Sequence, residues 1–223
     1  MRRFFLRIAA SAALVVSAAA GAATSSEFSA DMVITQGTGQ TVTEKLYVGK
    51  ARARLDRFAP AGESVRLNSL IMDFDHQLMY LVLPQEQMYL QIMGSSGIYF
   101  YRGSNLFRPQ TPDTACSDWI PEADRRGVTM HCQQAGQESI DGRPAQRWDA
   151  TATNGAHGSL WYDPSLNFVV KVVRVTKDGV QTGYELKNIK PGPQPADIFE
   201  LPTDYRQFTF NRLFELLTKL GQW

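Results

Sequence analysis

Short runs of alternating apolar and polar residues, each closed by a turn signal, constrain this sequence more than any other feature. The runs at 27–35, 41–48 and 51–58 alternate, and glycine-containing turns separate them. Successive side chains of an extended strand point to opposite faces, so these runs predict strands with one buried face. Asn154-Gly155 is a hairpin signal between two later runs. The sequence therefore predicts a mainly β, α+β fold, namely a curved antiparallel sheet or half-open β-barrel of about 10 to 11 strands.

Residues 78–83 and 94–135 depart from this rhythm in opposite ways. Both faces of the 78–83 run are largely apolar, which predicts a strand covered on both sides. The 94–135 segment instead contains prolines and scattered aromatic residues, and we expect it to form a short lid or insertion. Pro121 is suited to the first turn of one short helix within it.

The C-terminal segment has helical periodicity. Phe210, Leu213, Phe214 and Leu217 share one stripe, which predicts an amphipathic helix over 208–222. This helix either packs on the sheet or docks on a membrane or a partner protein.

The N-terminus has the pattern of an export signal. Arg2, Arg3 and Arg7 precede an uncharged stretch that is shorter than the roughly 20 apolar residues of a membrane-spanning helix. We expect residues 1–23 to be a signal peptide cleaved near Ala22 or Ala23, a retained anchor being the alternative. The two adjacent arginines resemble the twin-arginine export pattern, and the general secretory route fits as well. Residues 24–223 are then a single periplasmic domain with no transmembrane segment.

The charge balance argues against nucleic acid as a partner. The signal holds three of the 23 basic residues and none of the 22 acidic ones, so the mature chain is close to neutral. Nucleic-acid binding depends on neutralising phosphates, and this composition offers no basis for it.

Cys116 and Cys132 are the only cysteines in the chain. In an oxidising compartment they most simply form one structural disulfide, since a redox pair is usually spaced as Cys-x-x-Cys.

The sequence lacks the spaced constellations that catalysis needs, so we expect a protein that is not an enzyme and has no cofactor. Asp73, Asp75 and His76 are the best local candidates for a metal site. The same residue types are favoured in a hairpin turn, and we expect a turn and no metal.

Five motifs, taken in order, resemble the periplasmic lipoprotein-carrier (LolA/LolB-like) superfamily, in an uncharacterised branch. They are Phe28-Ser29-Ala30-Asp31-Met32, Leu46-Tyr47-Val48-Gly49-Lys50-Ala51-Arg52, Gly142-Arg143-Pro144-Ala145, Leu160-Trp161-Tyr162-Asp163 and Ile198-Phe199-Glu200-Leu201-Pro202-Thr203-Asp204-Tyr205. The resemblance implies a carrier or sensor that holds a lipid, a lipoprotein acyl chain or another apolar ligand in the concave face of a half-barrel. The alternative is a non-catalytic envelope scaffold or signalling subunit that acts through an envelope protein partner, because related proteins with this fold sense envelope stress or serve as scaffolds.

Alternation and this resemblance together suggest which side chains line the concave cleft. The candidates are Phe28, Met32, Leu46, Leu55, Leu70, Met72, Phe74 and Trp148. Alternatively, side chains fill the cleft and leave no room for a ligand.

Overall fold

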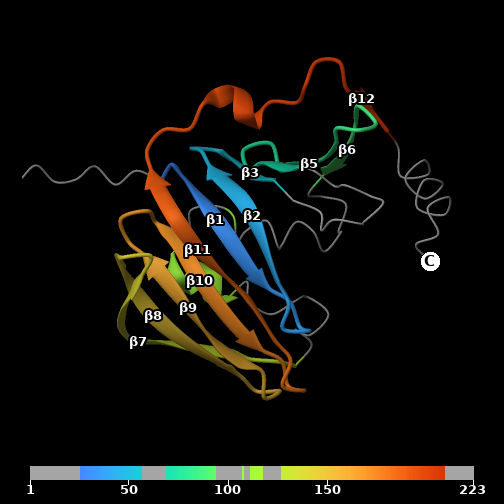
Figure 1. The fold of residues 1–223 in the computed structure, drawn as a ribbon. Helices are drawn as coiled ribbons and strands as arrows, with labels where there is room; N and C mark the ends of the chain where they lie inside the picture. The colour runs from blue at the N-terminus through green and yellow to red at the C-terminus, as the bar shows by residue number, and fades with distance from the viewer. Residues whose placement is uncertain (1–25, 57–68, 94–106, 108–110, 118–126, 209–223) are drawn as a thin grey trace, which may run out of the picture.

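Twelve strands form one open sheet in the computed structural model of the chain, which describes residues 26–56, 69–93, 107, 111–117 and 127–208 (Figure 1). The strands are β1 (Phe28–Thr35), β2 (Thr41–Val48), β3 (Arg52–Asp56), β4 (Ser69–Asp73), β5 (Leu78–Leu83), β6 (Met88–Met93), β7 (Met130–Ile140), β8 (Arg143–Ala152), β9 (His157–Asp163), β10 (Phe168–Val175), β11 (Gln181–Pro191) and β12 (Arg206–Gln207). A short helix α2 (Pro112–Ser117) and a 3-10 helix η4 (Ala196–Phe199) accompany them.

The sheet runs β12-β6-β5-β4-β3-β2-β1-β11-β10-β9-β8-β7, with β12 and β7 at opposite edges (Figure 1). Two antiparallel meanders, β1 to β6 and β7 to β11, are joined by the pairing of β1 with β11. Within the described chain, the β12–β6 pair alone is parallel. Hairpins suit such a meander because two antiparallel strands need only a short turn between them.

The two faces of the sheet differ in polarity. Cross-strand pairs such as Ala30–Leu46, Leu46–Leu55 and Leu55–Leu70 place apolar side chains in a row on one face, which we call the inner face. These residues belong to one buried hydrophobic cluster that extends from β4 and β5 to β8. The opposite, outer face carries ion pairs, for example Lys45 with Asp31 at 2.8 Å. The alternation read from the sequence thus separates a core face from a polar face.

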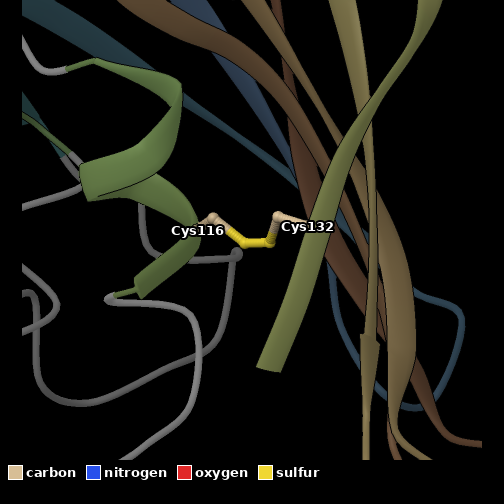
Figure 2. Close-up of a disulfide and its surroundings, with 2 residues drawn as sticks. All are labelled: Cys116 and Cys132. Atoms are coloured by element: carbon tan, nitrogen blue, oxygen red, sulfur yellow. A yellow bond between two sulfur atoms is a disulfide. The ribbon is translucent and has the colours of Figure 1, made fainter. Parts of the chain in front are cut away.

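Helix α2 lies against the inner face. Cys116 of α2 forms a disulfide with Cys132 of β7, and the two Cα atoms are 6.5 Å apart (Figure 2). Cys132 pairs across the strands with Ala150, a buried residue of the cluster, and Cys116 is itself buried there. The disulfide therefore fixes α2 over the part of the sheet formed by β7 to β9, and it confirms the expected pairing of the two cysteines.

Strands β4 and β5 are covered on both sides. Every residue of β4 is buried, and Met79 and Val82, on opposite faces of β5, are buried too. The chain after β11 covers part of the outer face beside β4. Arg54 of β3 links the two, because it donates hydrogen bonds to the Ile198 carbonyl at 2.8 Å and to the Ser69 hydroxyl of β4 at 2.9 Å. The two-sided burial expected for residues 78–83 is confirmed.

The strand count differs from the prediction. The sheet has twelve strands, and both β7 and β12 were missed. Strand β7 begins inside the expected lid range of 94–135, and the short helix in that range spans Pro112–Ser117. The helix expected to start at Pro121 and the signal peptide lie outside the described residues.

The C-terminal helix over 208–222 does not form part of the described structure. Its first residue, Phe208, follows β12 and is buried against Leu83 and Leu90 at the β6 edge of the sheet. Residues 209–223 lie outside the described part of the chain.

Candidate functional site

The eight side chains suggested for the concave cleft all belong to the hydrophobic cluster of the inner face. Six of them are buried, with exposures of 0–8%, and two are half-buried and pack against the others. The buried six are Phe28, Met32, Leu46, Leu55, Leu70 and Met72, and the half-buried two are Phe74 and Trp148. The sequence pattern placed them on one face, and whether they contact a ligand stays a prediction.

Trp148 is the polar exception in this set. It lies in β8 opposite Leu160, and its indole Nε1 is buried without a hydrogen-bond partner among the described residues. A buried N–H that stays unpaired costs free energy, so such groups are rare in folded proteins. Among the described residues, Trp148 therefore places an unpaired donor within the apolar inner face.

A cleft of about 610 Å³ opens at the hairpin end of the inner face. It lies where the turns between β8 and β9 and between β10 and β11 meet the start of β7. Its apolar lining consists of Val128, Met130, Ala152, Ala156, Val175 and Val180. The volume falls within the range of about 300–1,000 Å³ that is typical of small-ligand sites.

The cleft adjoins the hydrophobic cluster. Met130 lines the cleft and packs against the cluster, and it pairs with Ala152 of β8, another lining residue. None of the eight predicted cleft residues lines this space. The sequence contained one signal for it: Val180 is an apolar residue directly after the Lys177-Asp178-Gly179 turn. It is the one exposed large hydrophobic side chain of the described residues, at 42% exposure.

The polar side chains of the cleft include two cations, one carboxylate, one histidine and three neutral groups. Arg174 is half-buried near the end of β10, and Lys177 is exposed in the following turn. Asp178 is the one acidic lining residue, and His157 at the start of β9 completes the titratable set. The cleft therefore combines an apolar wall with two permanent positive charges and one negative charge.

The outer face behind the cleft is held by hydrogen-bonded ion pairs. Asp149 accepts hydrogen bonds from the Ser159 hydroxyl at 2.6 Å and from Arg147 Nε at 2.9 Å. The Ser159 hydrogen bond, followed by that of Arg147, holds the pKa of Asp149 below its ordinary value. Arg147 also bonds Glu138 at 3.0 Å, and this contact, with the Trp161 indole N–H, lowers the pKa of Glu138. These groups stabilise one another's charges on the outer face.

Asp75 and His76 lie in the turn between β4 and β5, as expected from the turn preference of these residues, and Asp73 is the last residue of β4. One carboxylate oxygen of Asp73 contacts the His76 backbone N at 3.0 Å and ring Nδ1 at 2.9 Å, and Arg52 contacts the other at 3.2 Å. Burial raises the pKa of Asp73, but these hydrogen bonds outweigh it and the net shift is downward. The parts of the chain that the structure describes contain no group of three or more His, Cys, Asp or Glu side chains placed to hold a metal ion.

The sequence matches no family model and no curated protein. Its fold does match solved structures. The crystal structure of MucB has a TM-score of 0.52 and 13% identity, with coverage of 80% of this chain and 58% of the MucB chain. A crystal structure of an uncharacterized conserved protein from Thermus thermophilus also has a TM-score of 0.52, at 8% identity, covering 82% of this chain and 90% of that one.

A LolA superfamily protein from Nitrosomonas europaea also matches, with a TM-score of 0.36, 13% identity and coverage of 78% and 90%. The structural matches thus include the superfamily suggested by the motif order, at low sequence identity. The two solved structures with TM-scores of 0.52 share the fold of this chain. This chain spans less than two thirds of the MucB chain, and the similarity concerns the fold alone.

The described helices are all too short or too polar to cross a membrane. The disulfide is consistent with export to an oxidising compartment, where such bonds persist.

Proposed function

We propose that this protein is an exported, non-catalytic binding protein that holds a lipid, a lipoprotein acyl chain or another apolar ligand against the inner face of its sheet. The observation that carries the proposal is the cleft of about 610 Å³ that adjoins the hydrophobic cluster at Met130. Ligand sites are concave and largely apolar, with a few polar groups that orient the ligand. The cleft has this composition, and the cluster continues the apolar surface beyond it.

In this proposal a ligand reaches the inner face at the hairpin end. The eight predicted side chains would form the deeper wall, with Trp148 offering its Nε1 as a donor to a ligand oxygen.

Mass spectrometry of the exported protein, purified without detergent, tests the proposal. We expect a bound lipid or acyl chain in the intact protein and its release after solvent extraction. A protein that is empty, and that stays empty after incubation with membrane extract, would contradict the proposal.

A matched pair of variants locates the ligand. Ala152 lines the cleft, whereas the neighbouring Thr151 is exposed and points to the other face. We expect Ala152→Phe to reduce lipid uptake because its ring occupies cleft volume, and Thr151→Phe to leave uptake unchanged. Equal uptake by both variants would place the ligand elsewhere.

The second candidate is a scaffold or signalling subunit that acts through an envelope protein. MucB, a protein of similar fold, has been solved in complex with MucA(peri). Deletion of residues 209–223 tests this candidate, since Phe208 and the strands before it are kept. A stable truncated protein that still recovers every envelope partner in cross-linked pull-downs would show that this segment is not the docking element.

A further inference from the structure

Strand β7 gives the sheet one long open edge (Figure 1). It has 11 residues, and among the described residues it pairs with β8 alone. The strand at the opposite edge, β12, has only two residues. An edge strand carries a row of backbone N–H and C=O groups that can pair with another strand. The β7 edge is therefore a surface on which a further strand can be added.

The first half of β7 turns every second backbone unit towards this edge. The Thr129 carbonyl, directly before β7, accepts a hydrogen bond from the Thr153 backbone N at 3.0 Å, so Thr129 faces β8. Residues of an antiparallel strand alternate between facing one neighbour and facing the other side. Met130, Cys132 and Gln134 therefore direct their N–H and C=O groups to the open edge.

These three residues are arranged symmetrically about Cys132. A second copy of β7, laid antiparallel with a twofold axis at Cys132, pairs Met130 of each copy with Gln134 of the other and Cys132 with its own counterpart. Residues that face each other in this way exchange both N–H···O=C hydrogen bonds, so every outward group of the run is used. A bulge between Gln134 and Gly136 ends the regular run at the same point.

The side chains of the run oppose a second copy with no like charges. Residues 130–134 contain no Lys, Arg, Asp, Glu or Pro, the residues that usually protect an edge strand from pairing. In the symmetric register each His131 faces Gln133 of the other copy, so two imidazoles do not meet. The first carboxylate of β7, Glu138, lies beyond the bulge and bonds Arg147 of its own chain at 3.0 Å.

We infer that two copies of this protein associate by antiparallel pairing of residues 130–134 of β7, which joins their sheets into one. Facing residues of paired strands point to the same side, so the two inner faces, each with its cleft beside Met130, lie on the same side of the joined sheet. The interface is short, and interfaces of this kind are weak and transient. The inference goes beyond the proposed function and does not depend on which ligand the cleft holds.

Sedimentation equilibrium of the exported, oxidised protein tests the association. Over roughly 5 to 500 µM, the range in which small interfaces associate, we expect the average mass to rise from that of one chain towards that of two.

Two proline variants test the edge. Gln134→Pro removes one outward N–H of the run, and proline is accepted at sheet edges, so the dissociation constant should rise at least about tenfold. Ser139→Pro is the matched control. Ile140 faces β8 because it closes the two-residue turn with Arg143, so Ser139 also directs its N–H to the open edge, but beyond the bulge. It should leave association unchanged.

A pair of double variants tests the register and uses two exposed side chains, His131 and Gln133. His131→Lys/Gln133→Lys places like charges opposite each other across the twofold axis, and His131→Glu/Gln133→Lys places opposite charges there. We expect the first variant to associate about tenfold more weakly than the second, since cross-strand pairs of like charge are destabilising and two such pairs form in each dimer. Thermal melts of all four variants check that the monomer remains folded.

Three results would overturn the inference. One is a protein that stays monomeric over the whole concentration range. If Gln134→Pro then removes an envelope protein from cross-linked pull-downs and Ser139→Pro does not, the edge pairs with a strand of that partner instead of a second copy. Another is a dimer that Gln134→Pro and Ser139→Pro affect equally. The last is a dimer in which the two double variants associate alike, which places the contact elsewhere. In each case lipid detection by mass spectrometry decides the proposed function separately.

Discussion

The disulfide between Cys116 and Cys132 should contribute a measurable part of the stability of this protein. It is the covalent link between α2, which lies on the inner face, and β7, the edge strand that within the described residues pairs with β8 alone (Figure 2). An edge strand has one hydrogen-bonded neighbour, so it depends more than a central strand on other attachments. Reduction of this bond should therefore loosen the β7 edge.

The expected magnitude follows from the length of the closed loop. The two cysteines are 16 positions apart. In the chain-entropy account, breaking a disulfide that closes a loop of this length gives the unfolded chain more conformational entropy. The free energy of unfolding then falls by about 3 kcal/mol. For a domain of this size that change corresponds to a melting temperature about 6–12 °C lower.

Urea denaturation with and without dithiothreitol measures this difference. We expect the free energy of unfolding to fall by about 3 kcal/mol on reduction. The Cys116→Ser/Cys132→Ser variant should match the reduced protein and should not respond to dithiothreitol. A reduced protein within about 1 kcal/mol of the oxidised one, the size of a typical substitution's effect, would refute the reasoning.

Three further predictions concern stability. Asp163→Asn should lower the free energy of unfolding by about 2–4 kcal/mol, because the buried carboxylate bonds Arg143 at 2.7 Å and that cation would lose its partner; urea denaturation checks this value. Asp149 has a lowered pKa in the folded protein, so it contributes stability above its unfolded pKa that is lost as pH falls through the folded pKa; the stability difference between the wild type and Asp149→Asn should shrink in unfolding measurements as the pH falls below the ordinary aspartate pKa of about 3.9. Gly183→Ala should destabilise by more than about 2 kcal/mol, since its Cβ would collide with the Val172 carbonyl oxygen, and a thermal melt near that of the wild type would count against it.

Alternation predicted most strands because one face of each is buried. The ranges 41–48 and 78–83 match β2 and β5, and the remaining predicted runs overlap their strands. Strand β7 was missed because most of its side chains are exposed on both faces, so it carries no two-residue hydrophobic period. Its place in the sheet is fixed by backbone pairing with β8, for which the amino-acid sequence gives no local signal.

The shared face of the eight predicted side chains could be predicted from the sequence, since the pleat of a strand places alternate residues on one face. The cleft could not be found in this way. Its walls come from two hairpin ends and from the start of β7, segments that are far apart in the sequence and are brought together by strand order. The Lys177-Asp178-Gly179 turn is recognisable in the sequence only as a connection between two strands. In the structure, Lys177 also lines the cleft.

In the proposed function, the hairpin end is the part of the inner face where a ligand would exchange at the lowest cost in free energy. At β4 and β5 the sheet is buried on both sides, so opening the inner face there would expose core residues such as Met72 to water. At the hairpin end the wall consists of turns and of an edge strand, and Val180 is already exposed. Turns can move without breaking the central strand pairs, which confines the motion to the segments of lowest local stability. An apolar ligand that enters beside Met130 would therefore reach the cluster while the rest of the sheet stays closed.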